Sequence, residues 1–313
     1  MIRYIFYRIF HIVIILFFTS IFIFFLLRLN NTDPIAQYLI HSNLPSTPEI
    51  IEEIKQQFGL DKPIIEQYIL WFKNAIFLDF GNSYITNRPV TQDFLTYLSN
   101  SLLLIFFGFL FIIIGSIPLG ILSAMYKDRL PDFIIRVFCF IGVCIPNFWL
   151  AFLLIIIFCI YLEWLPPLGI DGIKSFILPC ISISLMSLCI NTRLIRSNML
   201  EVKKDRHIIY AHLRGLSNTK ISIKHIFFNA IIPIVTALGM HIGELIGAAL
   251  IIETIFAIPG IGFYSLQGIV NHDYPIIQCF VILMCLVFTL CNLFVDILYA
   301  FLDPRVYKNI QED

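Results

Sequence analysis

Long apolar runs alternate with shorter polar stretches along the 313 residues of the chain. Six of these runs are long enough, at about 1.5 Å of helical rise per residue, to cross roughly 30 Å of hydrocarbon. They cover residues 9–27, 101–126, 134–162, 176–199, 228–255 and 276–302. Pro118 and Pro146 fall inside two of the runs and should kink those helices, which membrane helices tolerate. The pattern therefore predicts an all-α integral membrane protein with six transmembrane helices.

The composition is that of a membrane protein. Hydrophobic residues make up 59% of the chain and charged residues only 13%, and the mean hydropathy is +0.88. Soluble domains average about 25% charged residues, so this chain could not cover a water-facing surface. A formal net charge of zero argues against a nucleic-acid partner. The eight cysteines lie in or beside apolar runs without a CxxC pair, so we interpret them as reduced packing residues.

Basic residues are distributed unevenly between the two sets of loops. One set holds most of them: Arg3, Arg8, Lys127, Arg129, the stretch 201–233, Arg305 and Lys308. The opposite short loops, 163–175 and 256–275, carry only Lys174. Because basic loops stay inside, we expect both termini in the cytoplasm. The first run is too long for a signal-peptide core and no small-x-small site follows it, so we interpret it as a span.

Residues 30–100 form a long loop of mixed composition, expected to be a small helical cap outside the membrane. Its basic residues do not oppose this placement, because long loops translocate regardless of charge. Thr47 and Pro48 predict the start of a helix that should stop at Gly59. A second, amphipathic helix is expected over residues 63–77. It should bury three aromatic residues: Tyr68, Trp71 and Phe72.

A polar stretch, Glu201 to Pro233, separates two of the apolar runs. It carries six basic residues: Lys203, Lys204, Arg206, Arg214, Lys220 and Lys224. Short helices are expected over 205–213 and 219–228, on either side of Gly215. A glycine there ends a helix without a Cβ penalty and lets another backbone approach closely. On charge alone, the stretch could be no more than a topology signal.

The fifth run carries the most informative chemistry. Three of its glycines recur every four residues, the small-xxx-small pattern of close helix contact: Gly239, Gly243 and Gly247. His241 and Glu244 lie three residues apart and share a different face, with Met240 between the two faces. An acid at this depth costs roughly 2.5–3.5 kcal/mol by insertion scales, so it usually faces a cavity or a partner. Two interpretations stay open, namely a structural hydrogen bond and a polar patch on a conduction path that would suit a divalent transition metal.

Motifs typical of enzymes are missing from the sequence. It holds no HExxH, no GxSxG, and no GxxxxGK[ST] phosphate loop with which the chain could hydrolyse ATP itself. A secondary transporter or channel is an alternative class, which would need internal repeats or intramembrane ion-coupling acids. We find no repeats, and only Glu244, Asp296 and Glu253 are candidate acids.

The polar stretch resembles the coupling loop of ABC-importer permeases. The resemblance rests on Ala211, Gly215 and Pro233, with the run HIFFNA at 225–230 between them. In that family the loop forms a short helix that docks into a groove of a cytoplasmic ATPase. The resemblance implies that four residues lie at this contact: Ala211, Arg214, Gly215 and Leu216. The family's usual leading Glu is missing, with Ile209 near its place, and the dipeptide, oligopeptide and nickel branch commonly lacks that acid too.

Further strings extend the resemblance over nearly the whole chain. SNLPSTPE, GVCIPNFW and MHIGELIG resemble nickel-import permeases of the dipeptide/oligopeptide/nickel family, whereas PGIGFY and DYP are shared with peptide permeases in general. The resemblance implies the type I ABC-importer permease fold, with no cofactor bound by this chain and ATP hydrolysed by partner subunits. Nickel, free or chelated, would be the cargo, with His241, Glu244 and Met240 on its path and the first two as transient metal contacts. A di- or oligopeptide cargo is the alternative.

The same resemblance implies the partners and the organisation of the chain. A second, related permease would complete a heterodimer, joined by two ATPase subunits and an extracytoplasmic solute-binding protein. The chain itself would divide into four parts: an N-terminal helix (1–29), an extracytoplasmic cap (30–100), a five-helix core (101–302) containing the coupling loop (201–227), and a cytoplasmic tail (303–313).

Overall fold

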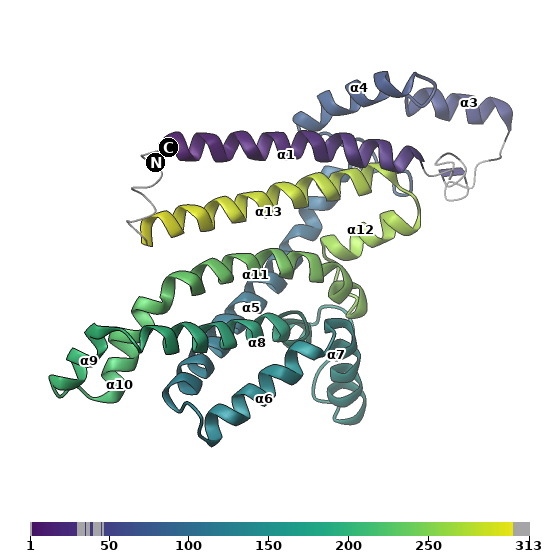
Figure 1. Cartoon of the computed structure of the whole chain (residues 1–313). Helices are drawn as coiled ribbons and strands as arrows, with labels where there is room; N and C mark the ends of the chain where they lie inside the picture. The colour runs from purple at the N-terminus through teal and green to yellow at the C-terminus, as the bar shows by residue number, and fades with distance from the viewer. Residues whose placement is uncertain (1, 30–34, 36–37, 40–44, 46, 303–313) are drawn as a thin grey trace. The chain divides into compact units, whose positions relative to one another are not determined.

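The chain folds into helices, as a computed structural model shows for residues 2–29, 35, 38–39, 45 and 47–302 (Figure 1). Within that part, the strand-type pairing is the isolated bridge between Asn82 and Pro89, so the all-α prediction is confirmed. The expected tail, 303–313, lies outside the described residues. Two compact units form, one from Leu102–Ile258 and the chain from Leu290, the other from Ile2–Ser101 and Pro259–Thr289.

Five helices in the described residues are long and apolar enough to cross a membrane. Their spans are Phe6–Leu29, Val90–Met125, Ile173–Val202, Pro233–Ile255 and Tyr274–Ile297. Two shorter apolar helices, Leu130–Cys144 and Asn147–Tyr161, meet at a bend of 102°, the geometry of either a broken span or a re-entrant loop. Counting that pair as one crossing gives the six spans that the hydropathy predicts.

The bend corrects the expectation of one kinked helix over 134–162. Helix α6 (Leu130–Cys144) ends before Ile145, whose backbone is extended with φ −85° and ψ 120°, and α7 (Asn147–Leu154) begins after Pro146. The residue before a proline is pushed out of the helical region, so the chain breaks here. Pro118 behaves differently, because α5 (Val90–Met125) continues through it.

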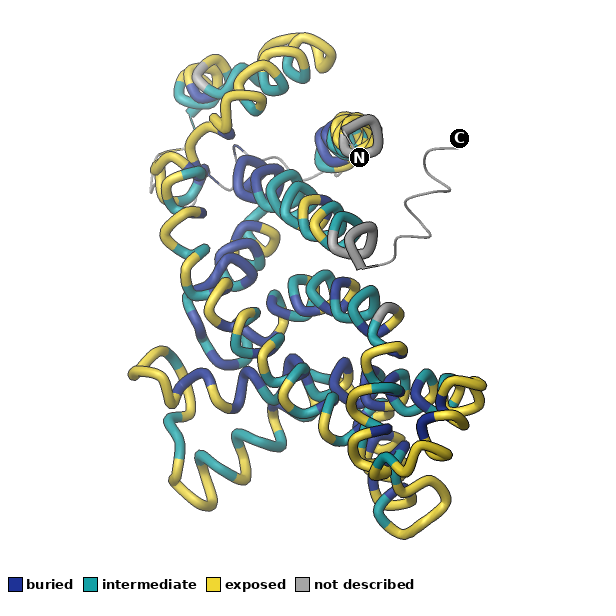
Figure 2. Tube along the Cα trace, turned by 90° about the vertical axis from the view of Figure 1, so that its left-hand side faces the viewer, coloured by how far each residue is buried: buried dark blue, intermediate teal, exposed yellow. Residues whose placement is uncertain are grey.

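Helix α8 (Ile177–Val202) is the centre of the first unit. In its most apolar stretch 61% is buried, against 17–28% for the other four long helices, and Figure 2 shows how exposed most helix faces are. Close packing against α8 depends on glycines of its neighbours. A Cβ on Gly115 of α5 would lie 2.5 Å from Leu188 Cδ1, and one on Gly142 of α6 would lie 2.5 Å from Cys189 Sγ. Small residues thus let backbones approach, as in other membrane bundles.

The remaining elements of the first unit follow the chain in order. Helix α7 continues as a π-helical turn, η1 (Ile155–Tyr161), and a 3₁₀ turn, η2 (Ile173–Phe176), leads into α8. The polar stretch forms α9 (Arg206–Leu213), α10 (Asn218–Lys220) and the π-helical η3 (Ile221–Phe227), which runs into α11 (Phe228–Ile255). Its last described helix, α13 (Tyr274–Leu302), enters this unit at Leu290.

The second unit contains α1 (Ile2–Leu29), α3 (Pro48–Gln57), α4 (Ile64–Ile76) and α12 (Ile261–Val270). The two cap helices lie where the sequence predicts them. The sequence predicts that α4 buries Tyr68, Trp71 and Phe72, but these side chains are only partly buried. The ring centroid of Phe24 on α1 lies 5.2 Å from that of Tyr68 and 5.5 Å from that of Trp71. Helix α12 was not expected, because the stretch 256–275 reads as a short loop between spans.

Candidate functional site

Helix α9 ends at a glycine in the left-handed conformation. Gly215 has φ +74°, its N–H bonds to the carbonyl of His212 at 2.9 Å, and the N–H of Leu216 bonds to that of Ala211 at 3.4 Å. These two bonds define the Schellman motif, in which glycine avoids the Cβ penalty of a positive φ. The expected close approach to Gly215 is absent among the described residues, because a Cβ there would meet nothing within 4 Å. Its backbone angle therefore explains this glycine.

The two faces of α9 are both apolar. Ile208 and Ala211 are buried against Ile195 and Met199 of α8, which fixes the helix on the body of its unit. On the opposite side lie three exposed apolar residues: Ile209 at 55%, Tyr210 at 65% and Leu213 at 78% exposure. An exposed apolar patch rimmed by polar residues is typical of a protein interaction site.

The expected second short helix of the polar stretch is not a separate element. Helix α10 begins after Ser217, whose side chain accepts from the N–H of Lys220. From there α10, η3 and α11 follow without an intervening turn, since Lys220 and Phe228 both keep right-handed helical angles. The polar stretch is thus joined directly to the helix that carries His241 and Glu244.

Glu244 of α11 is held by two neighbours. Nδ1 of His241 lies 2.8 Å from Oε2 of Glu244, and the hydroxyl of Ser187 on α8 donates to the same oxygen at 2.8 Å. The His241 side chain is only 3% exposed, whereas that of Glu244 is 51% exposed. With Glu244 ionised, Nδ1 must carry the proton of the pair, because a carboxylate oxygen only accepts.

This arrangement leaves one atom unused on each partner. Nε2 of His241 is buried and has no hydrogen-bond partner within the described part of the chain. Across the residues that the structure describes, Glu244 bonds through Oε2 alone, which leaves Oε1 open to a cation at membrane depth. Met240, one residue before the imidazole, is 63% exposed. The structural hydrogen bond that was one interpretation is present, and contact with cargo stays a prediction.

Resident metal binding has little support in the geometry. Among the residues that the structure describes, no three His, Cys, Asp or Glu side chains are grouped to hold a metal ion. His241 and Glu244 would supply two ligands at most, and Nδ1 and Oε2 already bond to each other. A lone exposed carboxylate suits a passing cation better than a held one.

The glycines of α11 occupy different environments. A Cβ on Gly239 would lie 2.2 Å from Cγ2 of Val295, so α13 packs directly on this glycine. A Cβ on Gly247 would meet nothing within 4 Å. The assignment of these glycines to helix packing stays a prediction. For Gly239, the contact with Val295 of α13 explains why a glycine is needed.

Two features of the site were not predicted from the sequence, namely the contact of Ser187 with Glu244 and the exposed apolar face of α9. Ser187 is one of several serines in α8, and only the packing of α8 on α11 brings it to Glu244. The sequence did contain a signal for Tyr210 and Leu213, because apolar residues three apart in a short basic helix predict an apolar stripe.

Comparison with known proteins adds relatives along the whole chain. A family model described as the inner membrane component of binding-protein-dependent transport systems matches residues 116–308, and one for the N-terminal part of such components matches residues 1–102. The chain is 34% identical to a dipeptide transport system permease of Alkalihalophilus pseudofirmus, over 83% of this chain and 87% of that protein. It is 31% identical to a glutathione transport system permease of Escherichia coli K12, over 98% and 100%.

A solved structure supports the fold. A chain of the MetNI methionine ABC transporter, in an inward-facing conformation, superposes with a TM-score of 0.57 at 15% identity, over 68% of this chain and 97% of that one.

Proposed function

Because the chain belongs to the family of inner membrane components of binding-protein-dependent transport systems, we propose that it forms half of the membrane path of an importer for short peptides. It is a multi-pass permease subunit of an ABC importer. The proposal adds the cargo class, which the curated relatives support, since their names give dipeptide and glutathione as what they transport.

The observation that carries the proposal is the fixed, half-exposed carboxylate of Glu244. A short peptide carries an α-ammonium group, and a carboxylate that keeps one oxygen free would pair with it transiently. Ser187 and His241 hold the other oxygen, so little ordering is needed when cargo arrives. The contact must stay weak, because a path that binds tightly cannot release.

The nickel assignment from sequence strings finds no support in these relatives. A divalent ion at Glu244 would find the imidazole of His241 already hydrogen-bonded to the carboxylate. The strings MHIGELIG and GVCIPNFW reflect the surfaces of helices more than a set of metal ligands. Peptide import therefore replaces nickel import as the preferred function.

The remaining assignments follow from membership in the family. A second permease would complete the path, and a solute-binding protein would deliver cargo. Two ATPases would hydrolyse ATP, one of them bound to the exposed face of α9. This chain would bind no cofactor. The exposed residues Ile209, Tyr210 and Leu213 would fill the ATPase groove, with Gly215 setting the direction in which the chain leaves it.

Transport by the assembled complex in liposomes tests the cargo. With binding protein saturated, labelled dipeptide should accumulate when ATP is present, and labelled nickel should not. Glu244→Gln should lower dipeptide uptake about tenfold or more, since a hydrogen bond to a charged group is worth roughly 1.5–3 kcal/mol. An N-acetylated dipeptide, which lacks the ammonium group, should lose little further in this variant.

The control is Ile251→Leu, an exposed position on α11 seven residues after Glu244 and so on the same helix face. It should transport like the wild type. ATP-driven nickel uptake without peptide uptake would reject the cargo proposal. A fall in complex abundance that accounts for all the lost uptake in Glu244→Gln would assign the pair a structural role instead.

A further inference from the structure

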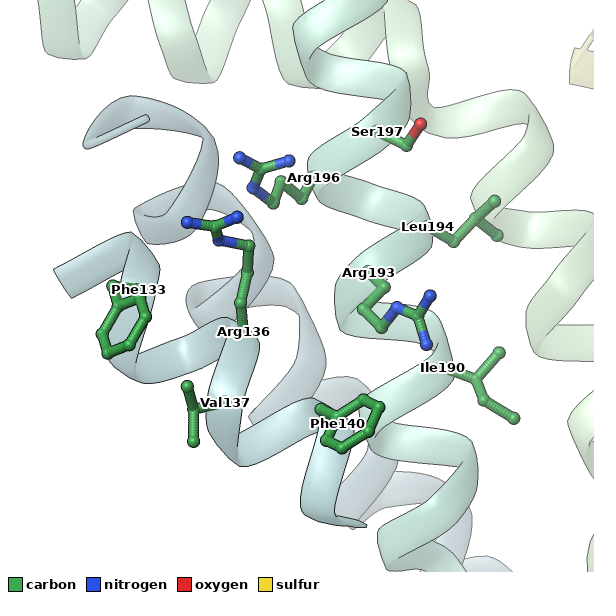
Figure 3. Close-up of a pocket in the computed structure, with 9 residues that line it drawn as sticks. All are labelled: Phe133, Arg136, Val137, Phe140, Ile190, Arg193, Leu194, Arg196 and Ser197. Atoms are coloured by element: carbon green, nitrogen blue, oxygen red, sulfur yellow. The ribbon is translucent and has the colours of Figure 1, made fainter. Parts of the chain in front are cut away.

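A groove of about 820 Å³ lies between α6 and α8, and its lining residues do not include His241 or Glu244 (Figure 3). Five apolar side chains, three arginines and one serine line it. Both helices belong to membrane-crossing segments, so a cluster of guanidinium groups here needs a partner. The question is how much of that positive charge the chain itself neutralises.

One arginine is fully paired. Arg196 donates from Nε to Oδ1 of Asp132 at 2.7 Å and from Nη2 to Oδ2 at 2.8 Å, a two-bond fork. The Asp132 side chain is completely buried and also accepts from Ser123 Oγ at 2.6 Å and from the N–H of Asp128 at 2.9 Å. Its acceptor positions are thus used by Arg196, Ser123 and the backbone.

The other two arginines are left without full compensation. Nε of Arg136 lies 3.6 Å from Oδ2 of Asp132, beyond hydrogen-bond range, and its side chain is 48% exposed. Arg193 is exposed and makes no hydrogen bond or ion pair with any residue that the structure describes. Figure 3 shows Arg136 and Arg196 with their guanidinium groups turned toward each other, and Arg193 one turn away on α8. The groove therefore carries a net positive charge.

The apolar lining continues away from the polar ends of the two helices. Phe140 lies further along α6 than Arg136, and Ile190 lies further from the end of α8 than Arg193. Phe133 and Phe140 are 57% and 67% exposed, which fits contact with hydrocarbon. Long arginine side chains on such helices turn toward the membrane surface.

A second hollow of about 550 Å³ shares Arg196 and Ser197 with the groove. Three lysines and one acid line it: Lys127, Lys203, Lys204 and Glu201, so its lining is still basic on balance. These residues come from the polar segments that follow α5 and α8, at the membrane-surface end of the groove. The lining thus changes from apolar through guanidinium to ammonium over one continuous surface.

We propose that the groove between α6 and α8 binds an anionic membrane phospholipid, with its phosphate at Arg136 and Arg193 and an acyl chain along Phe140 and Ile190. A phospholipid matches both parts of the lining, whereas a free phosphate or a peptide carboxylate leaves the apolar part uncovered. Basic pockets between membrane helices take lipid headgroups in this way. The proposal does not depend on what the importer carries.

The test uses the assembled transporter in nanodiscs that contain phosphatidylglycerol and phosphatidylcholine, with retained lipid measured by native mass spectrometry. The wild type should retain phosphatidylglycerol selectively. Each charge near a membrane surface contributes about fivefold in affinity, so Arg136→Gln with Arg193→Gln should weaken retention roughly 25-fold. The matched control is Arg129→Gln, which removes an exposed charge at the start of α6 outside both hollows and should retain lipid like the wild type.

Three results would overturn the proposal. The first is equal retention of the two lipids by the wild type. The second is displacement of phosphatidylglycerol by millimolar glycerol phosphate, which would assign the site to a free phosphate. The third is efficient crosslinking of a cysteine at Val137 to the second permease, which would make the groove a subunit interface. If the double variant does not assemble, Arg193→Gln alone serves in its place and should weaken retention about fivefold, whereas Arg193→Lys, which keeps the charge, should retain the lipid.

Discussion

Ser83 and Asp273 lie 190 residues apart in the sequence, and the serine hydroxyl donates a 2.6 Å hydrogen bond to Oδ2 of the buried carboxylate. The N–H of Ile85 reaches the same oxygen at 3.3 Å, and the N–H of Ile276 reaches Oδ1 at 3.3 Å. Asp273 directly precedes α13, so it serves as the N-cap of that helix while holding the turn before α5. One carboxyl group therefore links the turn before α5 to the start of α13 within the second unit.

The stability of this unit should depend on pH through Asp273. Burial raises the pKa of Asp273, and the Ser83 hydroxyl acts in the opposite direction. A raised folded pKa means that the group's contribution is complete below the unfolded pKa of about 4 and is lost as pH rises through the folded pKa. The melting temperature of the wild type should therefore fall relative to that of Asp273→Asn as the pH rises above about 4. Parallel pH curves would contradict this.

Gly215 should be replaceable only by residues that accept a positive φ. Because the space around it is open, Gly215→Val should fail through its backbone angle, which costs roughly 1–2 kcal/mol for an ordinary residue. Gly215→Asn should keep ATPase stimulation and transport, since asparagine visits this region readily. Loss of coupling in both variants would show that bulk, and not φ, matters at this position.

The outer face of α9 should act on coupling without acting on stability. Leu213→Ser changes a side chain that is 78% exposed, so complex abundance should stay normal while cargo-stimulated ATP hydrolysis falls at least severalfold. Ile208→Ser is the matched control on the inner face, 1% exposed, and should reduce abundance instead. Normal stimulation in Leu213→Ser would remove this face from the ATPase contact.

The α11 glycines should differ in their tolerance of alanine. Gly239→Ala would push a methyl group into Val295 and should cost about 1–3 kcal/mol of stability, measurable as a lower melting temperature. Gly247→Ala should leave the melting temperature of the chain unchanged. If Gly247→Ala nevertheless prevents co-purification of the second permease, the open end of the stripe is an interface between the two permeases.

Topology gives a fifth prediction. In a cysteine-free background, a single cysteine at Arg88 should react with an impermeant maleimide on intact cells, and one at Lys220 should react only after permeabilisation. The charge bias of the loops is the physical reason, because basic segments resist translocation. The reverse labelling pattern would invert the orientation of both termini.

Hydropathy predicted the spans well because their length is imposed by the bilayer, independently of neighbouring helices. It could not predict the break at Ile145, since whether a proline kinks or breaks a helix depends on what packs around it. Helix α12 was missed for a related reason, because its 10 residues are too short to be read as a span.

The site was predicted in part. Spacing placed His241 and Glu244 together on α11, but Ser187 reaches them only through tertiary packing. Arg136 and Arg193 belong to two different spans, so their shared groove is invisible to any local pattern. The strings that favoured nickel find no support in the relatives, whose names give dipeptide and glutathione, and short strings of helix residues do not identify the few side chains on which selectivity rests.

The unbroken path from η3 into α11 has a mechanical consequence. Phe228 and Glu244 belong to the same helix, α11, and lie about 24 Å apart along its axis. A tilt of about 10° at the loop end would carry the carboxylate by roughly 4 Å, more than the length of a hydrogen bond. Pro233 interrupts the backbone hydrogen bonds of α11 near the loop, so the helix would bend at this residue. A movement of the loop caused by the ATPase would therefore displace the Glu244 carboxylate as well. The bending of α11 at Pro233 would determine how much of that displacement reaches the carboxylate.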